Sequence, residues 1–445
     1  MSLLHKAMML LTIARARGFA ARAAVRAPTT RLMSAAAWEA LGLNSDMSDL
    51  VSKQWPEPNA VQRAALPALL KQEDDAVVGA ETGSGKTLAY LLPAAQRAVA
   101  NRRKHTPYPA ALVLVPNREL GTQLRRVAAR LGADTQPPFT DESKLFSLEA
   151  RHGGALARWP YAPGKAPDVL VATPSFAAAF DRDLDLWEGL STLVLDEADM
   201  LLDGGFKKQL DRCLVALKRV ERRREGNDDL VEDVPERCRR VVVAATLPNQ
   251  GLRSVDGLVT KYFANATRCA DLPMHGVVST LEHVFESVQS DDERDAKLND
   301  LLESTERTMV FCKTANRASA VSERLALGGI AAAPYTKDVD PERRLATLDL
   351  FASAKINVLV CTDLAARGLD LPEVKRVVQY DFATDAVSHL HRVGRAARAG
   401  AAASAVSFVD SSNTDLVAAL ERGDTVEHAF SRRRGLRKKL RKERV

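Results

Sequence analysis

A glycine-rich stretch in the first quarter of the chain has the residue types that hold a nucleotide. It spans residues 79–87 and reads Gly-Ala-Glu-Thr-Gly-Ser-Gly-Lys-Thr, directly after a short apolar run. Glycines let backbone N–H groups approach a phosphate at a helix N-terminus, while Lys86 can reach the β- and γ-phosphates and the Thr87 hydroxyl can ligate Mg²⁺. The nucleotide-binding residues predicted here are Ala80, Glu81, Thr82, Gly83, Ser84, Gly85, Lys86 and Thr87.

Two adjacent carboxylates follow a second apolar run, at 192–195. A strand that ends in Asp196 places its carboxylate where it can hold Mg²⁺, and Glu197 is suited to orient and deprotonate an attacking water. A phosphate-binding loop alone would also fit a kinase, a GTPase or a motor. The sequence Asp-Glu-Ala-Asp at 196–199, downstream of that loop, considerably reduces the number of nucleotide-binding protein classes that fit.

These two motifs and others that follow in order over about residues 38–409 resemble those of the DEAD-box ATP-dependent RNA helicases. The resemblance implies two RecA-like domains, each a parallel sheet flanked by helices, joined by a short linker. It also implies ATP and Mg²⁺ as cofactors and RNA as partner. In Pro-Asn-Ala-Val-Gln at 58–62, Gln62 is implied to bond the adenine edge, with Trp55 packed nearby.

RNA contacts are implied by several matching segments. The first half contributes Pro-Asn-Arg-Glu-Leu at 116–120, a glycine pair at 153–154 and Thr-Pro at 173–174, and the second half contributes 362–370. The implied RNA-contacting residues are Pro116, Arg118, Gly154, Thr173, Thr362 and Asp363. The second half is also implied to contact the nucleotide, through Gly368, Asp370, Arg395 and Arg398.

The final motif, at 391–400, supplies the implied arginine fingers Arg395 and Arg398. Guanidinium groups delivered from the opposite domain stabilise charge on the γ-phosphoryl group only when the domains close. This arrangement would couple RNA binding to hydrolysis. The implied catalytic residues are Lys86, Glu197, Arg395 and Arg398.

Some positions depart from the family pattern. Ser175 and Phe176 replace Gly and Arg, Ala244 replaces Ser, and Asp340 stands where Gln is usual three residues before Arg343. Ala396 and Ala397 replace Thr and Gly. None of these changes removes a phosphate or Mg²⁺ ligand, so ATP chemistry is expected to be intact.

Two of these departures bear on RNA coupling. Phe176 cannot donate the charge-assisted bond of an arginine, and Ala244 has no hydroxyl. We therefore expect RNA-stimulated ATPase with poor strand separation, and partial recovery of RNA affinity in Phe176→Arg. The alternative is that Phe176 packs against helices of its own domain or stacks on a base, in which case arginine would lower affinity.

Short β-branched runs alternate with helical patterns from residue 38 on, which is typical of βαβ units. Strands are expected at 76–80, 111–115, 169–172, 192–195 and 241–245, then at 309–312, 358–362, 376–380 and 405–409. Pro273 and Gly276 indicate a linker at about 268–283. The predicted domains are 38–270 and 283–425. The charged segment 218–240 is interpreted as a surface insertion.

Charge is concentrated at the ends of this 445-residue chain of net charge +6. Residues 1–38 contain six Lys/Arg and no acid, and residues 431–445 contain nine Lys/Arg against one Glu. Residues 39–430 therefore carry −8, so RNA contacts in the body must come from locally placed donors. The basic tail, 426–445, is expected to attract RNA without sequence preference.

The N-terminal segment 1–37 is Ala- and Arg-rich and lacks acids, which is typical of a mitochondrial transit peptide. A plastid address, or an extension of a nuclear or cytoplasmic protein, is the alternative. The apolar stretch at 7–14 is far shorter than the roughly 20 residues of a membrane span, so no membrane association is expected. Five cysteines without a CxxC pair indicate neither a disulfide framework nor a zinc ribbon.

The leading hypothesis is an ATP-dependent RNA helicase, expected to be a monomer, that remodels local RNA duplexes or ribonucleoprotein complexes. The alternative is an ATP-gated RNA clamp that scaffolds ribonucleoprotein assembly and unwinds little. A DNA helicase with the same core is a third reading. Contacts to the sugar-phosphate backbone carry little sequence information, so the sequence does not identify the RNA.

Overall fold

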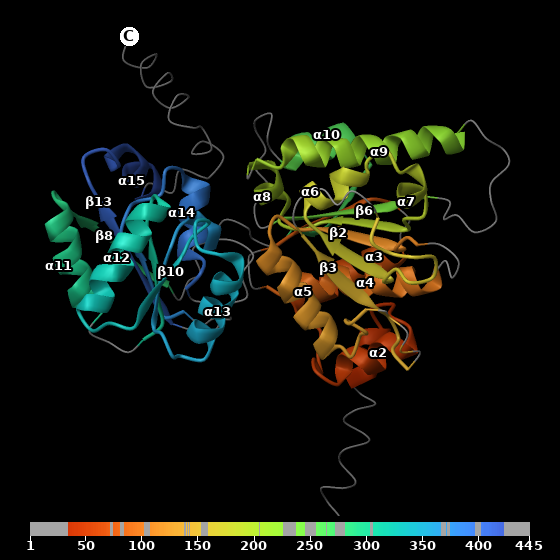
Figure 1. Ribbon diagram of the computed structural model, residues 1–445, viewed down its shortest axis with the longest axis horizontal. Helices are drawn as coiled ribbons and strands as arrows, with labels where there is room; N and C mark the ends of the chain where they lie inside the picture. Colours follow the sequence, from red (N-terminus) through yellow and green to blue (C-terminus); the bar gives the residue numbers. More distant parts are fainter. Residues whose placement is uncertain are drawn as a thin grey trace, which may run out of the picture.

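The computed structural model describes residues 34–421, except for 72–73, 81–83, 102–106, 153–158, 226–236, 245–254, 272–280, 303–305, 366–370, 372–373, 397–401, Pro138, Thr140, Glu142, Gly204 and Ala264. The described residues form two α/β domains that lie beside each other in Figure 1. Each contains one parallel sheet flanked by helices, so the predicted fold class is confirmed.

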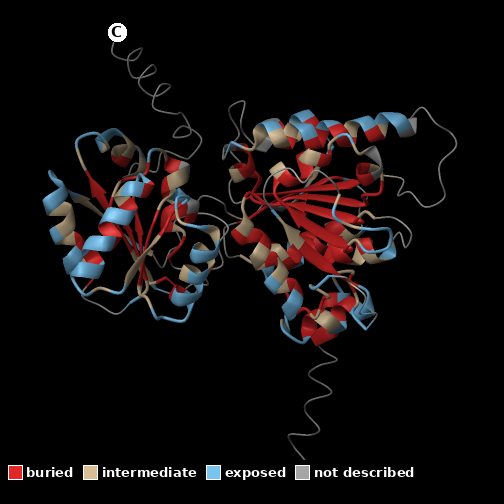
Figure 2. Cartoon of the chain, viewed as in Figure 1, coloured by how far each residue is buried: buried red, intermediate tan, exposed pale blue. Residues whose placement is uncertain are grey.

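The N-terminal domain has a seven-stranded sheet in the order β3-β4-β2-β5-β6-β1-β7. Its strands are β1 (Ala76–Gly79), β2 (Ala111–Leu114), β3 (Leu148–Arg151), β4 (Val169–Ala172), β5 (Thr192–Leu195), β6 (Arg239–Ala244) and β7 (Thr267–Asp271). Every residue of the five inner strands is buried, and Figure 2 shows them as one continuous buried layer. Such burial is expected for a parallel sheet covered on both faces.

Two groups of helices cover the sheet of the N-terminal domain. On one face, α3 (Ala60–Lys71), α4 (Lys86–Ala100) and α5 (Arg118–Arg130) contribute to one apolar core, with α2 (Ser45–Ser52) beside them. The other face carries α6 (Pro174–Ala177), the 3₁₀ turn η1 (Ala178–Phe180), α7 (Leu184–Glu188), α8 (Ala198–Asp203), α9 (Lys207–Glu225) and α10 (Val255–Tyr262).

The C-terminal domain has a six-stranded sheet in the order β10-β11-β9-β12-β13-β8. Its strands are β8 (Leu281–Ser287), β9 (Thr308–Phe311), β10 (Ala332–Tyr335), β11 (Val358–Cys361), β12 (Arg376–Gln379) and β13 (Ala403–Val409). The first core contains residues of α11 (Asp291–Leu301) and α12 (Ala315–Leu327). The second contains residues of α13 (Pro341–Ala352), η2 (Asp363–Ala365) and α14 (Ala386–Val393), and the last helix is α15 (Thr414–Glu421).

The nine predicted strands are all present, with ends that shift by up to two residues. Four further strands were not predicted: β3, β7, β8 and β10. All four lie at the edges of the two sheets. Because β7 and β8 occupy the two ends of the predicted linker, the connection between the sheets is shorter than expected and lies between Asp271 and Leu281.

The folded N-terminal domain begins before the predicted boundary at residue 38. Residues 34–39 are helical, and the fully buried Trp38 donates its Nε1–H to the carbonyl oxygen of Trp55 at 2.9 Å. The helix that contains Trp38 therefore starts ahead of the predicted domain boundary. No helix within the described residues is long and apolar enough to cross a bilayer. All five cysteines are free thiols.

Candidate nucleotide and RNA site

The predicted nucleotide residues meet at one edge of the N-terminal sheet. Strands β5, β6 and β1 are neighbours and run parallel, so their carboxyl ends lie together. Ala80 follows β1, Asp196 follows β5, and Ala244 ends β6. The carboxyl edge of a parallel sheet is where open α/β folds bind ligands.

Lys86 begins α4 at the end of the phosphate-binding loop. Its buried side chain donates to the carbonyl oxygen of Ala80, and the preceding Gly85 has the left-handed φ of 89°. This φ is unfavourable for any residue with a Cβ atom, and a Cβ atom there would also lie 2.1 Å from the Asn59 Nδ2 atom. Three of the predicted loop residues, Glu81, Thr82 and Gly83, lie outside the described residues.

Gln62 braces this loop from the start of α3. Its Nε2–H donates to the Gly85 carbonyl oxygen at 3.2 Å, and its Oε1 accepts from the backbone N–H of Asn59 at 2.8 Å. Asn59 in turn donates from Nδ2 to the Ser84 carbonyl oxygen at 2.9 Å. Gln62 thus contacts the phosphate-binding loop. Trp55 instead packs beneath the guanidinium of Arg130, whose Cζ atom lies 4.8 Å from the centroid of the Trp55 ring.

Asp196 is held by a tyrosine that sequence reasoning did not identify. The Tyr90 hydroxyl donates to Asp196 Oδ2 at 2.7 Å, and it is also hydrogen-bonded to the side chain of Thr87. The two predicted Mg²⁺ ligands, Thr87 and Asp196, therefore meet at one hydroxyl group. Burial raises the pKa of Asp196, and its hydrogen bond to Tyr90 opposes that rise.

Glu197 has the features of a poised base. It is buried, it adopts a left-handed φ of 48° that is unfavourable for a residue with a Cβ, and its Oε2 has no hydrogen-bond partner among the described residues. Burial raises the pKa of Glu197 to about 7. The charge of Lys86 opposes this rise, and so does that of Arg395 in the other domain.

The C-terminal domain reaches this site through the end of α14. Arg395 is fully buried and lies close enough to Glu197 to affect its titration. One turn earlier, His391 Nε2 lies 3.5 Å from Asp199 Oδ2. The structure therefore shows the two domains closed over the predicted catalytic residues. The other three predicted nucleotide contacts of this domain, Gly368, Asp370 and Arg398, lie outside the described residues.

A buried polar network supports α14. Arg392 donates to both carboxylate oxygens of Asp363, at 2.6 and 3.1 Å, and to the side-chain oxygen of Gln379 at 3.3 Å. Gln379 also bonds His389 Nδ1 at 2.9 Å and Ser407 Oγ at 2.8 Å. Asp363, predicted to contact RNA, is thus engaged by Arg392, although its side chain remains 52% exposed. The half-buried Thr362 precedes it at the end of β11.

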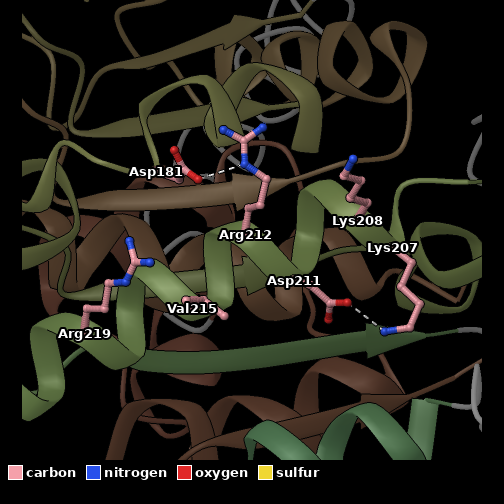
Figure 3. A pocket seen from close by; sticks show the side chains of 7 residues that line it. All are labelled: Asp181, Lys207, Lys208, Asp211, Arg212, Val215 and Arg219. Atoms are coloured by element: carbon pink, nitrogen blue, oxygen red, sulfur yellow. Dashed lines mark hydrogen bonds and ion pairs between the residues drawn. The ribbon is translucent and has the colours of Figure 1, made fainter.

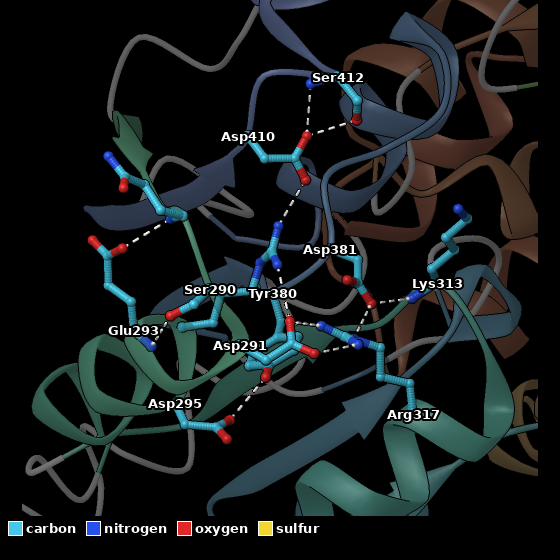
Figure 4. Close-up of polar contacts among 12 residues, drawn as sticks. Ser290, Asp291, Glu293, Asp295, Lys313, Arg317, Tyr380, Asp381, Asp410 and Ser412 are labelled. Atoms are coloured by element: carbon cyan, nitrogen blue, oxygen red, sulfur yellow. Dashed lines mark hydrogen bonds and ion pairs between the residues drawn. The ribbon is translucent and has the colours of Figure 1, made fainter.

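A second ionic network fixes the neighbouring strand ends, as Figure 4 shows. Asp381, just after β12, accepts from the backbone N–H of Lys313 at 2.8 Å and lies 3.0 Å from Arg317 Nε. Arg317 and Arg294 both bind Asp291 at the start of α11. These contacts join the ends of β9 and β12 to α11 and α12.

The predicted RNA contacts of the N-terminal domain follow two neighbouring strands. Pro116 lies between β2 and α5, Arg118 is the first residue of α5, and Thr173 is the N-cap residue of α6 after β4. Strands β2 and β4 are parallel neighbours, so these residues share one edge of the sheet. Gly154 lies outside the described residues.

The packing alternative for Phe176 is the one that the structure supports. Phe176 is 1% exposed, and its ring centroid lies 5.5 Å from that of Phe180 and 6.4 Å from that of Trp159. An arginine here would bury its guanidinium among aromatic rings. Recovery of RNA affinity in Phe176→Arg is therefore no longer expected.

Two ion pairs connect the domains through α5 and α13. Glu119 Oε1 lies 2.6 Å from Arg344 Nε, and Arg126 lies 3.2 Å from Asp349. Arg344 thus forms an ion pair across the domain interface, whereas the neighbouring Arg343 is exposed. Asp340 instead caps α13 by accepting from backbone N–H groups.

Comparisons with known proteins agree with this geometry. The model of the DEAD/DEAH box helicase family matches residues 59–255, and that of the helicase conserved C-terminal domain matches residues 293–400. DEAD-box ATP-dependent RNA helicase 22 of Oryza sativa is 31% identical, over 91% of this chain and 84% of the relative. Probable ATP-dependent RNA helicase DDX28 of Homo sapiens is 33% identical, over 87% and 73%.

Solved structures show the same two-domain arrangement. A Dbp5 variant from S. cerevisiae bound to RNA and ADP BeF3 matches with a TM-score of 0.68 and 25% identity, over 86% of this chain and 93% of that one. Mss116p bound to ssRNA and AMP-PNP has a TM-score of 0.70 over 87% and 77%, and at 21% identity it supports the fold alone. The chain belongs to the DEAD-box family of ATP-dependent RNA helicases.

Proposed function

We propose that this helicase uses closure of its two domains around ATP·Mg²⁺ to strain and locally open RNA duplexes or ribonucleoprotein complexes. The observation that carries the proposal is the position of Glu197. Its buried carboxylate oxygen, which has no hydrogen-bond partner within the described part of the chain, shares a site with Lys86 from its own domain and Arg395 from the other. A base enclosed in this way by two cations is suited to orient the attacking water when the γ-phosphoryl group carries developing charge.

Helix α5 links RNA contact to closure of the two domains. Arg118, a predicted RNA contact, begins α5, and the next residue is Glu119, which binds Arg344 of the C-terminal domain. RNA that binds Arg118 in the closed state more tightly than in the open state would shift the population toward closure. Closure in turn brings Arg395 to Glu197.

The residues present fit an Mg²⁺ ion. Thr87 and Asp196 converge on the Tyr90 hydroxyl, so one hydroxyl and one carboxylate would hold the ion beside the nucleotide phosphates. Mg²⁺ in nucleotide enzymes is usually held by one or two protein oxygens, the phosphates and water. That pattern agrees with the absence, among the described residues, of a cluster of three or more potential metal-binding side chains.

We further propose that the helicase acts as a monomer in mitochondria, with ribonucleoprotein components among its partners. The acid-free, Arg-rich composition of the N-terminal segment supports the location. Because the packed helix begins by Ser34, the leader would have to end before that residue. A reporter fused to residues 1–33 should enter mitochondria, and a reporter that stays in the cytosol would contradict this part of the proposal.

The main proposal is tested by measuring ATP turnover with poly-RNA, with poly-DNA and without polymer. We expect stimulation by RNA only. A strand-displacement assay on an RNA duplex with a single-stranded extension then separates helicase from clamp, because a clamp would retain RNA in the presence of ATP without separating its strands. Equal stimulation by DNA and RNA would contradict the proposed substrate class.

A further inference from the structure

Helix α9 is basic, in contrast to the acidic region of the chain that contains it. Although residues 39–430 together are acidic, the 19 residues of α9 contain eight Lys/Arg and three Asp/Glu. Lys208, Arg212, Arg219 and Arg222 recur at helical spacing, so they lie along one face of the helix over roughly 21 Å. All four are exposed.

This face borders a groove of about 540 Å³ between α9 and the turn after η1. Figure 3 shows Lys208, Arg212 and Arg219 extending from α9 along it. The floor includes Val215, which is 40% exposed. The groove is lined by four Lys/Arg and two Asp, so its walls are predominantly positive.

The two acids of the groove are already engaged. Asp181 accepts from Arg212 Nε at 2.8 Å, and Asp211 binds both Lys207 Nζ, at 2.9 Å, and the Tyr262 hydroxyl, at 3.0 Å. The hydrogen bond from Arg212, with further attraction from nearby arginines, lowers the pKa of Asp181. The outer Nη groups of Arg212 remain available, and within the described residues neither Lys208 nor Arg219 has an ion-pair partner.

The groove is connected along the chain to a predicted RNA contact. Thr173 caps α6, α6 leads directly into η1, and η1 ends at Phe180, next to Asp181 in the groove wall. Helix α9 itself packs against α6 and η1. The row of cations therefore lies on a helix that contacts the element capped by Thr173.

We propose that this groove is an additional phosphate-binding surface for the RNA that flanks the segment gripped between the domains. The inference rests on the RNA-helicase function and extends its binding surface. Exposed Lys and Arg in a row match the repeating charge of a nucleic-acid backbone, which dominates affinity without reading sequence. A protein partner is the less suitable occupant, because Val215 is the one exposed large apolar residue described in the groove, and protein interfaces favour aromatic anchors.

The test compares two variants with equal charge change. Lys208→Gln/Arg219→Gln removes two groove cations, and Lys53→Gln/Lys355→Gln removes two exposed cations elsewhere. RNA affinity is measured between 50 and 200 mM salt, with a short single strand and with a long RNA that extends past the core. For the long RNA, the slope of log affinity against log salt concentration should be shallower by roughly 1.5 in the groove variant than in the wild type. Over this salt range, the loss of affinity in the groove variant should therefore be roughly tenfold smaller than the loss in the wild type. The short strand should bind both variants alike.

Identical salt slopes for the two variants on long RNA would show a merely solvated helix face and overturn the proposal. Loss of poly-glutamate binding in the groove variant with unchanged RNA binding would assign the groove to an acidic protein segment, which also overturns it. Failure of the proposed function would look different, because the wild type itself would then lack RNA-stimulated ATPase. ATP turnover without RNA should be unchanged in both variants.

Discussion

Glu119 of α5 and Arg344 of α13 form an ion pair of 2.6 Å across the domain interface, with side chains that are only 1% and 12% exposed. Arg344 Nη1 also donates to the Val339 carbonyl oxygen at 3.2 Å, which fixes the guanidinium. A buried ion pair has a high desolvation cost, and removal of one partner leaves an uncompensated charge that typically costs about 3–5 kcal/mol. The pair therefore makes the closed state sensitive to both residues.

Combining the two substitutions of this pair should impair closure less than their separate effects would predict. We expect Glu119→Gln and Arg344→Gln each to lower RNA-stimulated kcat/KM at least roughly tenfold, and the double variant to lose less than the product of the two effects. The matched control is the exposed pair Arg126 and Asp349, whose removal should cost at most about 1 kcal/mol. Strictly multiplicative effects at Glu119 and Arg344 would show that the pair does not act as a unit.

Phe176→Arg should destabilise the N-terminal domain. The substitution places a charge among the rings of Trp159 and Phe180, so we expect a loss of at least about 3 kcal/mol in the free energy of unfolding. Phe176→Leu, which keeps the site apolar, should cost clearly less. Denaturant unfolding measures both values, and an arginine variant as stable as the wild type would show that this side chain can reach solvent.

Tyr90→Phe should raise the Mg²⁺ concentration that ATP hydrolysis requires. Loss of the hydroxyl removes the 2.7 Å hydrogen bond that orients Asp196 and the contact that joins it to Thr87. One such bond is worth about 1–1.5 kcal/mol, so half-maximal ATPase should require several-fold more Mg²⁺. Tyr108→Phe, which removes a hydroxyl bonded to Asp183, is the control. Equal Mg²⁺ requirements in the two variants would exclude a role for Tyr90 at the metal.

The buried imidazole of His389 should make the free energy of unfolding depend on pH. Burial lowers its pKa from 6.5 to about 3, with added repulsion from His283 and Arg392. As the pH falls below about 6.5, the unfolded chain binds a proton that the folded chain does not, so the free energy of unfolding should fall by up to about 1.4 kcal/mol per pH unit. Above pH 6.5 this contribution is constant. His389→Gln should show a shallower decline, and parallel curves for variant and wild type would contradict the assignment.

Inner strands could be predicted from the sequence because burial on both faces requires continuous apolar runs, as at 169–172 and 358–361. The four edge strands lack this signal. In β8 exposed and partly buried residues alternate, and β10 has a single buried residue, Tyr335. Edge strands pair on one side only and are covered incompletely, so their composition resembles that of loops.

The site residues also divide into those that a local sequence motif predicts and those that have no such motif. Gln62, Lys86, Asp196 and Glu197 follow motifs of fixed spacing, and the structure brings them together at one sheet edge. The supporting residues Tyr90, Arg344 and Gln379 have no local signal, because each acts through a partner at least 10 positions away. Phe176 shows the converse error. The family pattern alone predicts a lost RNA contact at this position, whereas the aromatic neighbours of Phe176 explain the residue by packing.

The proposed catalytic mechanism depends most on Glu197, the base whose site is completed when the two domains close. The direct test is ATP turnover by Glu197→Gln at saturating ATP, Mg²⁺ and RNA, with RNA retention measured in the same samples and Lys86→Ala for comparison. The amide has the same shape but cannot accept the proton, so turnover should fall at least roughly a hundredfold while ATP-dependent RNA binding persists. Lys86→Ala should lose both. Normal turnover by Glu197→Gln with RNA bound would contradict the account.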